Sequence, residues 1–238
     1  FGFYALYAPG TSVETEAVSS QLFRDWSLRT VAIKPYPICH FNHAPVDAAL
    51  ALRSEHAIAP DVIKSVTILL DDRQFGVVAS PIEAKRAPQS EYDAKFSAPY
   101  AVATALCKGS FSLADLEDAA RMDPEVLSLA QRVVCAHDAR SRYPDAFSGG
   151  VKITLTDGTE LEHFEALNRG AEGQLLPAEQ VKAKFLDNCA LTIPTDRAER
   201  LWNAMLNLDE MNDVAELMAL LRTESNRAAQ QPSGSEAC

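Results

Sequence analysis

The order of predicted elements along the chain favours an α+β fold. A short helix and an extended segment come first, followed by a helix, a strand, further helices, a β-hairpin and a closing set of helices. Strands and helices do not alternate regularly, so the order does not fit a doubly wound α/β sheet. The sequence also lacks a G-x-G-x-x-G motif, a P-loop and a G-x-S-x-G turn. Nucleotide-binding and serine-hydrolase functions therefore lose their usual support.

The first part of the chain is predicted to be helical at both ends. Capping and acidic residues open a short helix within residues 11–25, and residues 26–33 look extended. Apolar residues then recur at helical spacing over residues 43–57, with Asp47 on the side predicted to face water.

The middle of the chain is predicted to hold a strand and the most regular helix. The β-branched run 62–70 predicts a strand, whereas the turn-forming residues of 71–90 predict a loop. Apolar side chains share one side of a helix over residues 91–108. Within it, Pro99 predicts either a kink or the true start of the helix, and Gly109 its C-cap.

The second half begins with two short helices and a hairpin. Capping residues precede the helical runs 113–121 and 124–133. Apolar residues alternate with polar ones over residues 151–164, on both sides of the tight-turn pair Asp157-Gly158. We therefore expect a hairpin with one buried face and one face in water.

The chain is predicted to end in helices and a disordered tail. A helix over residues 177–189 precedes a helix pair over 197–221, whose apolar stripes need a partner surface. Residues 227–238 contain too few apolar side chains to offset the entropy cost of ordering them.

The bulk composition excludes several classes of protein. The 238 residues are 47% hydrophobic and 23% charged, as in one large or two small globular domains. A net charge of −11 argues against a nucleic-acid binder, which needs a basic face. No apolar run is long enough to span a bilayer, and the Phe-Gly-Phe-Tyr start does not resemble a signal peptide. We expect a cytoplasmic protein without a membrane partner.

The cysteines favour free thiols in a reducing compartment. Five of them are scattered along the chain without a C-x-x-C pair, at positions 39, 107, 135, 189 and 238. Cys39, His40 and His43 lie close together in sequence, but no second cluster completes a zinc site. We therefore predict no metal site, and the missing nucleotide-binding motifs predict no nucleotide cofactor.

The segment 34–43, which reads Lys-Pro-Tyr-Pro-Ile-Cys-His-Phe-Asn-His, concentrates site chemistry. Its two prolines favour an extended, stiff backbone. Asn42 is a candidate N-cap, which would place His43 in the first turn of a helix, where backbone N–H groups favour anions. With Lys34 beside it, this helix start would suit a carboxylate ligand.

Several ordered motifs resemble the MmgE/PrpD family. They are Lys34-Pro-Tyr-Pro-Ile-Cys39 with His43, Asp93-Ala-Lys-Phe-Ser-Ala-Pro-Tyr100, Val151-Lys-Ile-Thr-Leu-Thr-Asp-Gly158, Asn168-Arg-Gly170 and Lys184-Phe185. The opening Gly2-Phe3-Tyr4 is similar to a segment found well inside family members. The resemblance covers essentially the whole chain except its tail.

The resemblance implies a large all-helical domain, interrupted by a smaller α+β lid domain, with the active site in the cleft between them. Residues 1–33 would end the helical domain, 34–190 would form the lid, 191–224 would return to the helical domain, and 225–238 would be a disordered tail. We expect most of the helical domain to lie upstream of Phe1, so that this chain provides one wall of the site.

The same resemblance implies the C-terminal portion of a metal-independent lyase that acts on a small di- or tricarboxylate, as 2-methylcitrate dehydratase does. An iminodisuccinate-epimerase-like isomerase and a cis-aconitate-type decarboxylase are alternatives within the family. A non-catalytic assembly or binding module is an alternative from another class. Expected partners are the polycarboxylate, the upstream helical domain and a second copy in a homodimer. We expect this portion alone to be inactive.

Five residues are candidates for the site. Lys34 is the first choice as catalytic residue and carboxylate clamp, the alternative being an ordinary surface lysine. His43 could serve as an acid or base near neutral pH, or merely stand at a helix start. Three further substrate-binding candidates are His40, where the family usually has no histidine, Lys95 and Arg169. A solvated loop arginine is the alternative for Arg169.

Overall fold

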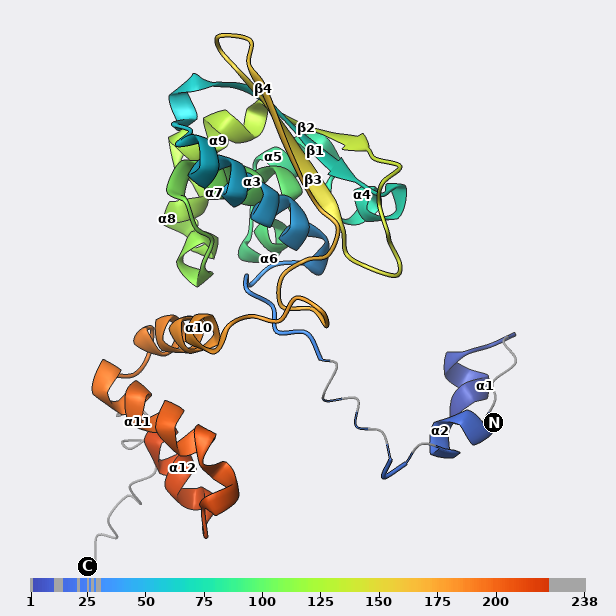
Figure 1. Ribbon diagram of the computed structural model, residues 1–238, viewed down its shortest axis with the longest axis vertical. Helices are drawn as coiled ribbons and strands as arrows, with labels where there is room; N and C mark the ends of the chain where they lie inside the picture. The colour runs from blue at the N-terminus through green and yellow to red at the C-terminus, as the bar shows by residue number, and fades with distance from the viewer. Residues whose placement is uncertain are drawn as a thin grey trace, which may run out of the picture. The chain divides into compact units, whose positions relative to one another are not determined.

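The computed structural model describes residues 2–10, 15–20, 22–24, 26, 28 and 31–222. The predicted helix start at 11–14 and the predicted tail at 225–238 lie outside the described residues. The chain divides into two compact units, residues 1–32 and 33–238 (Figure 1). The first unit contains α1 (Phe3–Tyr7) and α2 (Thr15–Ser20).

The second unit combines helices with a β-sheet, which confirms the predicted α+β class. Its α-helices are α3 (His43–His56), α4 (Asp72–Val78), α5 (Ile82–Arg86), α6 (Glu91–Lys95), α7 (Ala98–Lys108), α8 (Asp118–Arg121), α9 (Pro124–Gln131), α10 (Ala178–Ala190), α11 (Thr195–Leu206) and α12 (Val214–Leu221). Its strands are β1 (Ile63–Leu70), β2 (Val133–His137), β3 (Gly149–Leu155) and β4 (Glu160–Glu165). Short 3₁₀ turns precede α3, β1 and α8.

Within the described residues, the four strands form one mixed sheet in the order β2-β1-β3-β4. The strand β1 pairs in parallel with β2, where Val66 faces Val133, and antiparallel with β3. The predicted hairpin is confirmed as β3 and β4, and Gly158 in its turn has a positive φ of 90°. A residue with a Cβ rarely adopts this backbone conformation, which explains the glycine.

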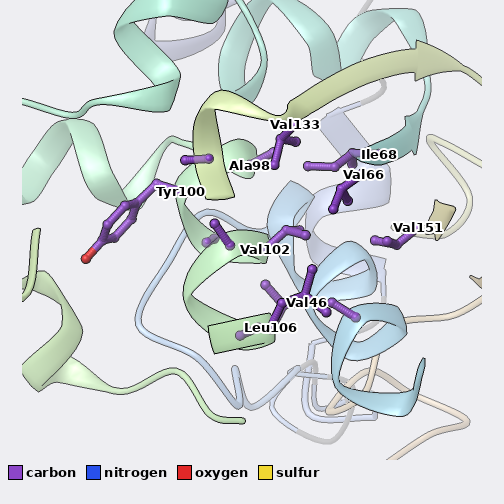
Figure 2. Close-up of a cluster of buried hydrophobic side chains, with 14 of the residues drawn as sticks. Val46, Val66, Ile68, Ala98, Tyr100, Val102, Leu106, Val133 and Val151 are labelled. Carbon is purple, nitrogen blue, oxygen red and sulfur yellow. The ribbon is translucent and has the colours of Figure 1, made fainter. Parts of the chain in front are cut away.

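The core lies between the sheet and the helices α3 and α7. In Figure 1, both helices lie on the same side of the sheet, and α9 packs against α7. Val66 and Ile68 of β1 and Val151 of β3 meet Val46 of α3 and Val102 of α7 (Figure 2). Removing such surface from water stabilises a fold by roughly 25 cal/mol per Å². The core thereby fixes α3, whose first turn carries His43.

Residues 71–90 form two helices, so the predicted loop is wrong. Asp71 caps α4 through a bond from the Arg73 N–H to Asp71 Oδ1 of 2.9 Å, while Gln74 Oε1 accepts from the Asp71 N–H at 3.0 Å. This reciprocal capping box satisfies N–H groups that would otherwise lack partners. The proline-rich stretch supplies the N-cap of α5 at Pro81.

The predicted long helix over residues 91–108 is two helices, α6 and α7. Ser97 caps α7, and Pro99 lies in its first turn, where the missing N–H of proline costs nothing. The alternative in which a helix starts near Pro99 is thus confirmed. Gly109 ends α7 with a φ of 75°, as predicted for a C-cap.

The strand β2 was not expected, since residues 124–133 are predicted as a helix. The helix α9 ends at Gln131, and β2 begins two residues later. The Arg86 guanidinium donates to the Val133 carbonyl through Nη2 at 2.8 Å and through Nε at 3.1 Å. Because β2 gains its ladder from β1, far away in sequence, helical periodicity alone could not locate it.

The helices α10, α11 and α12 share a smaller apolar cluster. Ile193, Ala198 and Leu201 are its buried members, and Phe185 and Trp202 have ring centroids 5.4 Å apart. The predicted apolar stripes are only partly covered, because several large side chains on α11 and α12 remain exposed. These are Met205, Leu206, Val214, Met218 and Leu221.

Membrane spans and disulfides are two further features on which the sequence makes a prediction. No helix in the described part of the chain is long and apolar enough to cross a membrane. The four cysteines that the structure describes, at positions 39, 107, 135 and 189, are all free thiols.

Candidate functional site

The segment after Lys34 bends back on itself, so the predicted extended backbone is wrong. Residues 35–38 form bends, and a 3₁₀ turn over His40–Asn42 leads into α3. The bends bring the exposed Lys34 over the Ile38 carbonyl, to which its Nζ donates at 3.1 Å. Nε2 of His43 lies 3.3 Å from the same oxygen. The side chains of the two residues that the sequence favours as catalytic therefore contact the same carbonyl oxygen.

The end of α6 holds this segment through its main chain. The Cys39 N–H donates to the Lys95 carbonyl at 2.8 Å, and Asn42 Nδ2 donates to it at 3.3 Å. Asn42 occupies the N-cap position of α3, as predicted, although its side chain makes no capping bond there. The Lys95 ammonium pairs with Glu91 on its own helix.

A buried carboxylate connects this segment to a distant loop. Asp47 is only 5% exposed, so the prediction that it faces water is wrong. Its Oδ1 accepts from the Tyr36 hydroxyl at 2.6 Å and from Arg169 Nε at 2.7 Å. Burial and the charge of Asp47 raise the pKa of Tyr36, so this hydroxyl stays protonated and donates. Arg169 is thereby paired with a carboxylate of its own chain.

A glycine lets the same loop approach the start of the segment. The Ile33 N–H donates to the Gly170 carbonyl at 2.9 Å, and Gly170 has a φ of 84°. A Cβ at position 170 would lie 1.9 Å from the Ile33 carbonyl oxygen, which no side chain can tolerate. The loop 168–170 therefore contacts the chain on both sides of Lys34.

A second lysine, Lys184, contacts the main chain of the segment at Lys34. The Lys184 ammonium, from α10, donates to the Lys34 carbonyl. Partial burial and the charge of Lys34 lower the pKa of Lys184. Among the described residues, neither ammonium forms an ion pair. The sequence indicates Lys184 only as part of a motif that resembles the family, because local periodicity does not show which residues lie close to Lys34 in space.

The two histidines before and in α3 lie side by side. Their ring centroids are 4.8 Å apart, and His43 is fully buried. Burial lowers the pKa of His43 to about 3, with the charges of His40 and Lys34 adding to the effect. His43 is therefore neutral at pH 7, and its contact with the Ile38 carbonyl places the proton on Nε2. Its Nδ1 has no partner within the described part of the chain.

A cavity of about 520 Å³ lies next to the bent segment. Pro35, Tyr36, Phe111, Arg169, Gln180 and Lys184 line part of it. Lys34, His40 and His43 are not among its lining residues, so the cavity shares Tyr36 and Lys184 with the site without containing the histidines. Its volume is in the range of small-ligand pockets. In the described residues, no three His, Cys, Asp or Glu side chains gather as metal ligands.

Comparison with known proteins places these motifs in one family. A family model described as the MmgE/PrpD C-terminal domain matches residues 36–210. Cis-aconitate decarboxylase of Mus musculus is 27% identical, over 94% of this chain and 46% of that protein. Cis-aconitate decarboxylase of Homo sapiens is 26% identical, over 94% of this chain and 45% of that protein. The cis-aconitate decarboxylase-like protein oryM of Aspergillus oryzae is 23% identical, over 94% of this chain and 48% of that protein. The chain spans about half the length of the curated relatives it matches.

We predict that Asp47→Asn destabilises the chain by about 2 kcal/mol, because it leaves Arg169 without its counter-charge and weakens the bond from Tyr36. Urea unfolding followed by circular dichroism measures the change. Asp61→Asn, at an exposed position, is the matched control and should change stability by less than about 0.5 kcal/mol. Equal effects of the two variants would contradict a structural role for Asp47.

Lowering the pH should destabilise the folded chain, because His43 is buried in its neutral form. Its pKa is about 3 in the folded chain, against 6.5 as the ordinary value, so its contribution to stability is present above pH 6.5 and is lost as the pH falls. Between pH 6 and 4, wild-type stability should therefore fall about 1.4 kcal/mol per pH unit more steeply than that of His43→Asn. Urea unfolding across this range, with the exposed His56→Asn as control, tests the difference. Parallel curves for wild type and His43→Asn would refute it.

Proposed function

The chain belongs to the MmgE/PrpD family, and from this we propose that it forms the C-terminal part of a metal-independent lyase that decarboxylates a small polycarboxylate of the cis-aconitate type. The observation that carries the proposal is the contact of the Lys184 ammonium with the Lys34 carbonyl, at a place where neither lysine has a carboxylate partner in the described part of the chain. The names of the relatives support this reaction over the dehydration that the family resemblance put first.

Two adjacent cations suit a ligand that carries several negative charges. A carboxylate about 4 Å from an ammonium gains about 4 kcal/mol in an environment of intermediate dielectric constant. Partial burial and the charge of Lys34 both lower the pKa of Lys184, so the charged form of Lys184 is disfavoured until an anion binds. A di- or tricarboxylate that reaches both lysines would relieve this effect. We therefore assign carboxylate binding to Lys34 and Lys184 together.

Decarboxylation asks for the same cationic surface. The bond between a carboxylate carbon and the carbon chain breaks, and CO₂ leaves. The electron pair of this bond stays on the chain carbon that carried the carboxylate. A proton must then reach that carbon. The lysines would hold the carboxylates that remain and stabilise the charge that develops. We propose that the proton donor comes from the longer protein outside this chain.

The geometry favours a positioning role for His43 rather than proton transfer. Its ring is fully buried, and its Nε2 lies against the Ile38 carbonyl that also binds Lys34. A group with a pKa of about 3 is a weak base at neutral pH. We propose that His43 holds the bend on which Lys34 is mounted. Lys95 and Arg169, which have carboxylate partners of their own, are weaker substrate-binding candidates than the two lysines.

The remaining parts of the proposal concern the longer protein. Residues 34–190 would act as a lid over the active-site cleft, and 191–224 would pack on an upstream helical domain. The exposed apolar side chains of α11 and α12, such as Leu206 and Met218, support this assignment because they need a covering surface. A cytoplasmic homodimer completes the proposal.

The test is turnover by the product of the longest open reading frame that contains this sequence. Release of CO₂ from cis-aconitate would support the proposal. Dehydration of 2-methylcitrate without CO₂ release would favour the second lyase reaction, and inversion of iminodisuccinate would favour an isomerase. Absence of all three activities in a folded product would overturn the enzymatic proposal in favour of a binding or assembly module.

We predict that Lys34→Ala and Lys184→Ala each lower kcat/KM in this longer product by about tenfold or more, because each removes one of the two cations that hold the substrate. Steady-state kinetics with cis-aconitate measures the change. Lys64→Ala is the matched control, since Lys64 is an exposed lysine on β1. Unchanged kcat/KM in both site variants would show that the lysine pair is not the carboxylate site.

A further inference from the structure

His40 is held in a fixed position between a ring and a buried amide. It lies in the 3₁₀ turn before α3, and its ring stacks on Phe147, with centroids 4.4 Å apart and planes 4° from parallel. Its Nε2 lies 2.8 Å from Nδ2 of Asn168, in the loop that also carries Arg169. The ring plane and one of its two nitrogens are therefore fixed by the protein.

The orientation of the Asn168 amide decides which nitrogen of His40 carries a proton. Asn168 is fully buried, and its Nδ2 also donates to the Arg169 carbonyl at 3.2 Å. Rotating the amide would place Oδ1 against that carbonyl, where two acceptors repel. The NH₂ group therefore gives one hydrogen to the carbonyl and the other to His40 Nε2. Nε2 must then be an acceptor, and the proton of the neutral ring stands on Nδ1.

The Nδ1–H of His40 is the part of the ring left available to a ligand. No acceptor in the described chain binds it, and the residue is only partly buried. Burial and the charge of Lys34 lower the pKa of His40, which is consistent with a neutral ring. His40 thus differs from the lysines nearby, because it offers one directed hydrogen bond without a positive charge.

We propose that Asn168 fixes the tautomer of His40, and that the His40 Nδ1–H donates a hydrogen bond to an oxygen of the polycarboxylate held by Lys34 and Lys184. This deepens the proposed function and, for the identity of the ligand, rests on it. The lysines would attract any small polyanion, whereas a directed donor separates anions of equal charge by where they present an oxygen. His40 is then a specificity-determining residue and Asn168 a positioning residue.

The tautomer can be observed without any activity. In the longer product with ¹⁵N-labelled histidine, a long-range ¹H–¹⁵N correlation spectrum at pH 7 should show His40 with Nδ1 protonated and Nε2 unprotonated, the His40→Asn variant identifying its signals. Asn168→Asp replaces the donor with an acceptor, so Nε2 should become protonated. Asn188→Asp, at an exposed position on α10, is the control and should leave His40 unchanged. A wild-type His40 protonated on Nε2 would overturn the proposal even if Asn168→Asp does not fold.

Ligand recognition has separate readouts. Saturating cis-aconitate should shift the Nδ1 resonance of His40 in the same sample, and no shift would overturn the recognition role. In kinetics, His40→Leu should raise KM about tenfold with kcat changed by less than about threefold. His40→Asn, whose amide nitrogen stands close to the place of Nδ1, should restore most of the loss. Loss of kcat at unchanged KM would contradict the role in recognition. An inactive longer product with the expected tautomer would count against the proposed function and leave the Asn168 assignment standing.

Discussion

The geometry of the site depends on the hydrogen bonds of the buried Asp47 carboxylate. This carboxylate accepts from Tyr36, which is two residues after Lys34, and from Arg169, which lies in a loop 122 residues after Asp47. A buried carboxylate is stable only when it is paired and hydrogen-bonded. Moving either Tyr36 or Arg169 away would therefore remove a partner that the Asp47 carboxylate needs. The helix α3, which carries Asp47 in the core, thus sets the position of the bent segment and of the loop at once.

Several features of the site follow from this constraint. With Arg169 held on Asp47, the preceding Asn168 reaches His40, and the following Gly170 packs against the Ile33 backbone. The bend after Lys34 then points its ammonium and the His43 ring at one carbonyl oxygen. Arg169 is already paired with Asp47, whereas Lys34 and Lys184 form no ion pair within the described residues. The two lysines are therefore better placed than the arginine to bind an anionic ligand. The fold therefore separates the residues that build the site from those offered to a ligand.

The sequence predicted the parts of this arrangement that local physics determines. The hairpin at Asp157-Gly158, the helix start near Pro99 and the cap at Gly109 follow from single-residue preferences. Three other features depend on partners far away in sequence, which helical periodicity cannot report. They are the burial of Asp47, the strand β2 and the contact of the Lys184 ammonium with the Lys34 carbonyl. The motifs that resemble the MmgE/PrpD family cover part of this gap, since they include Asn168 in its loop and Lys184 in its helix.

The central claim is that Lys34 and Lys184 together form the carboxylate site. A crystal structure of the longer product with a bound tricarboxylate that resists turnover tests it most directly. We expect carboxylate oxygens about 3 Å from the ammonium groups of both lysines. A ligand bound away from both lysines, or lysines paired instead with carboxylates of the upstream part, would contradict it.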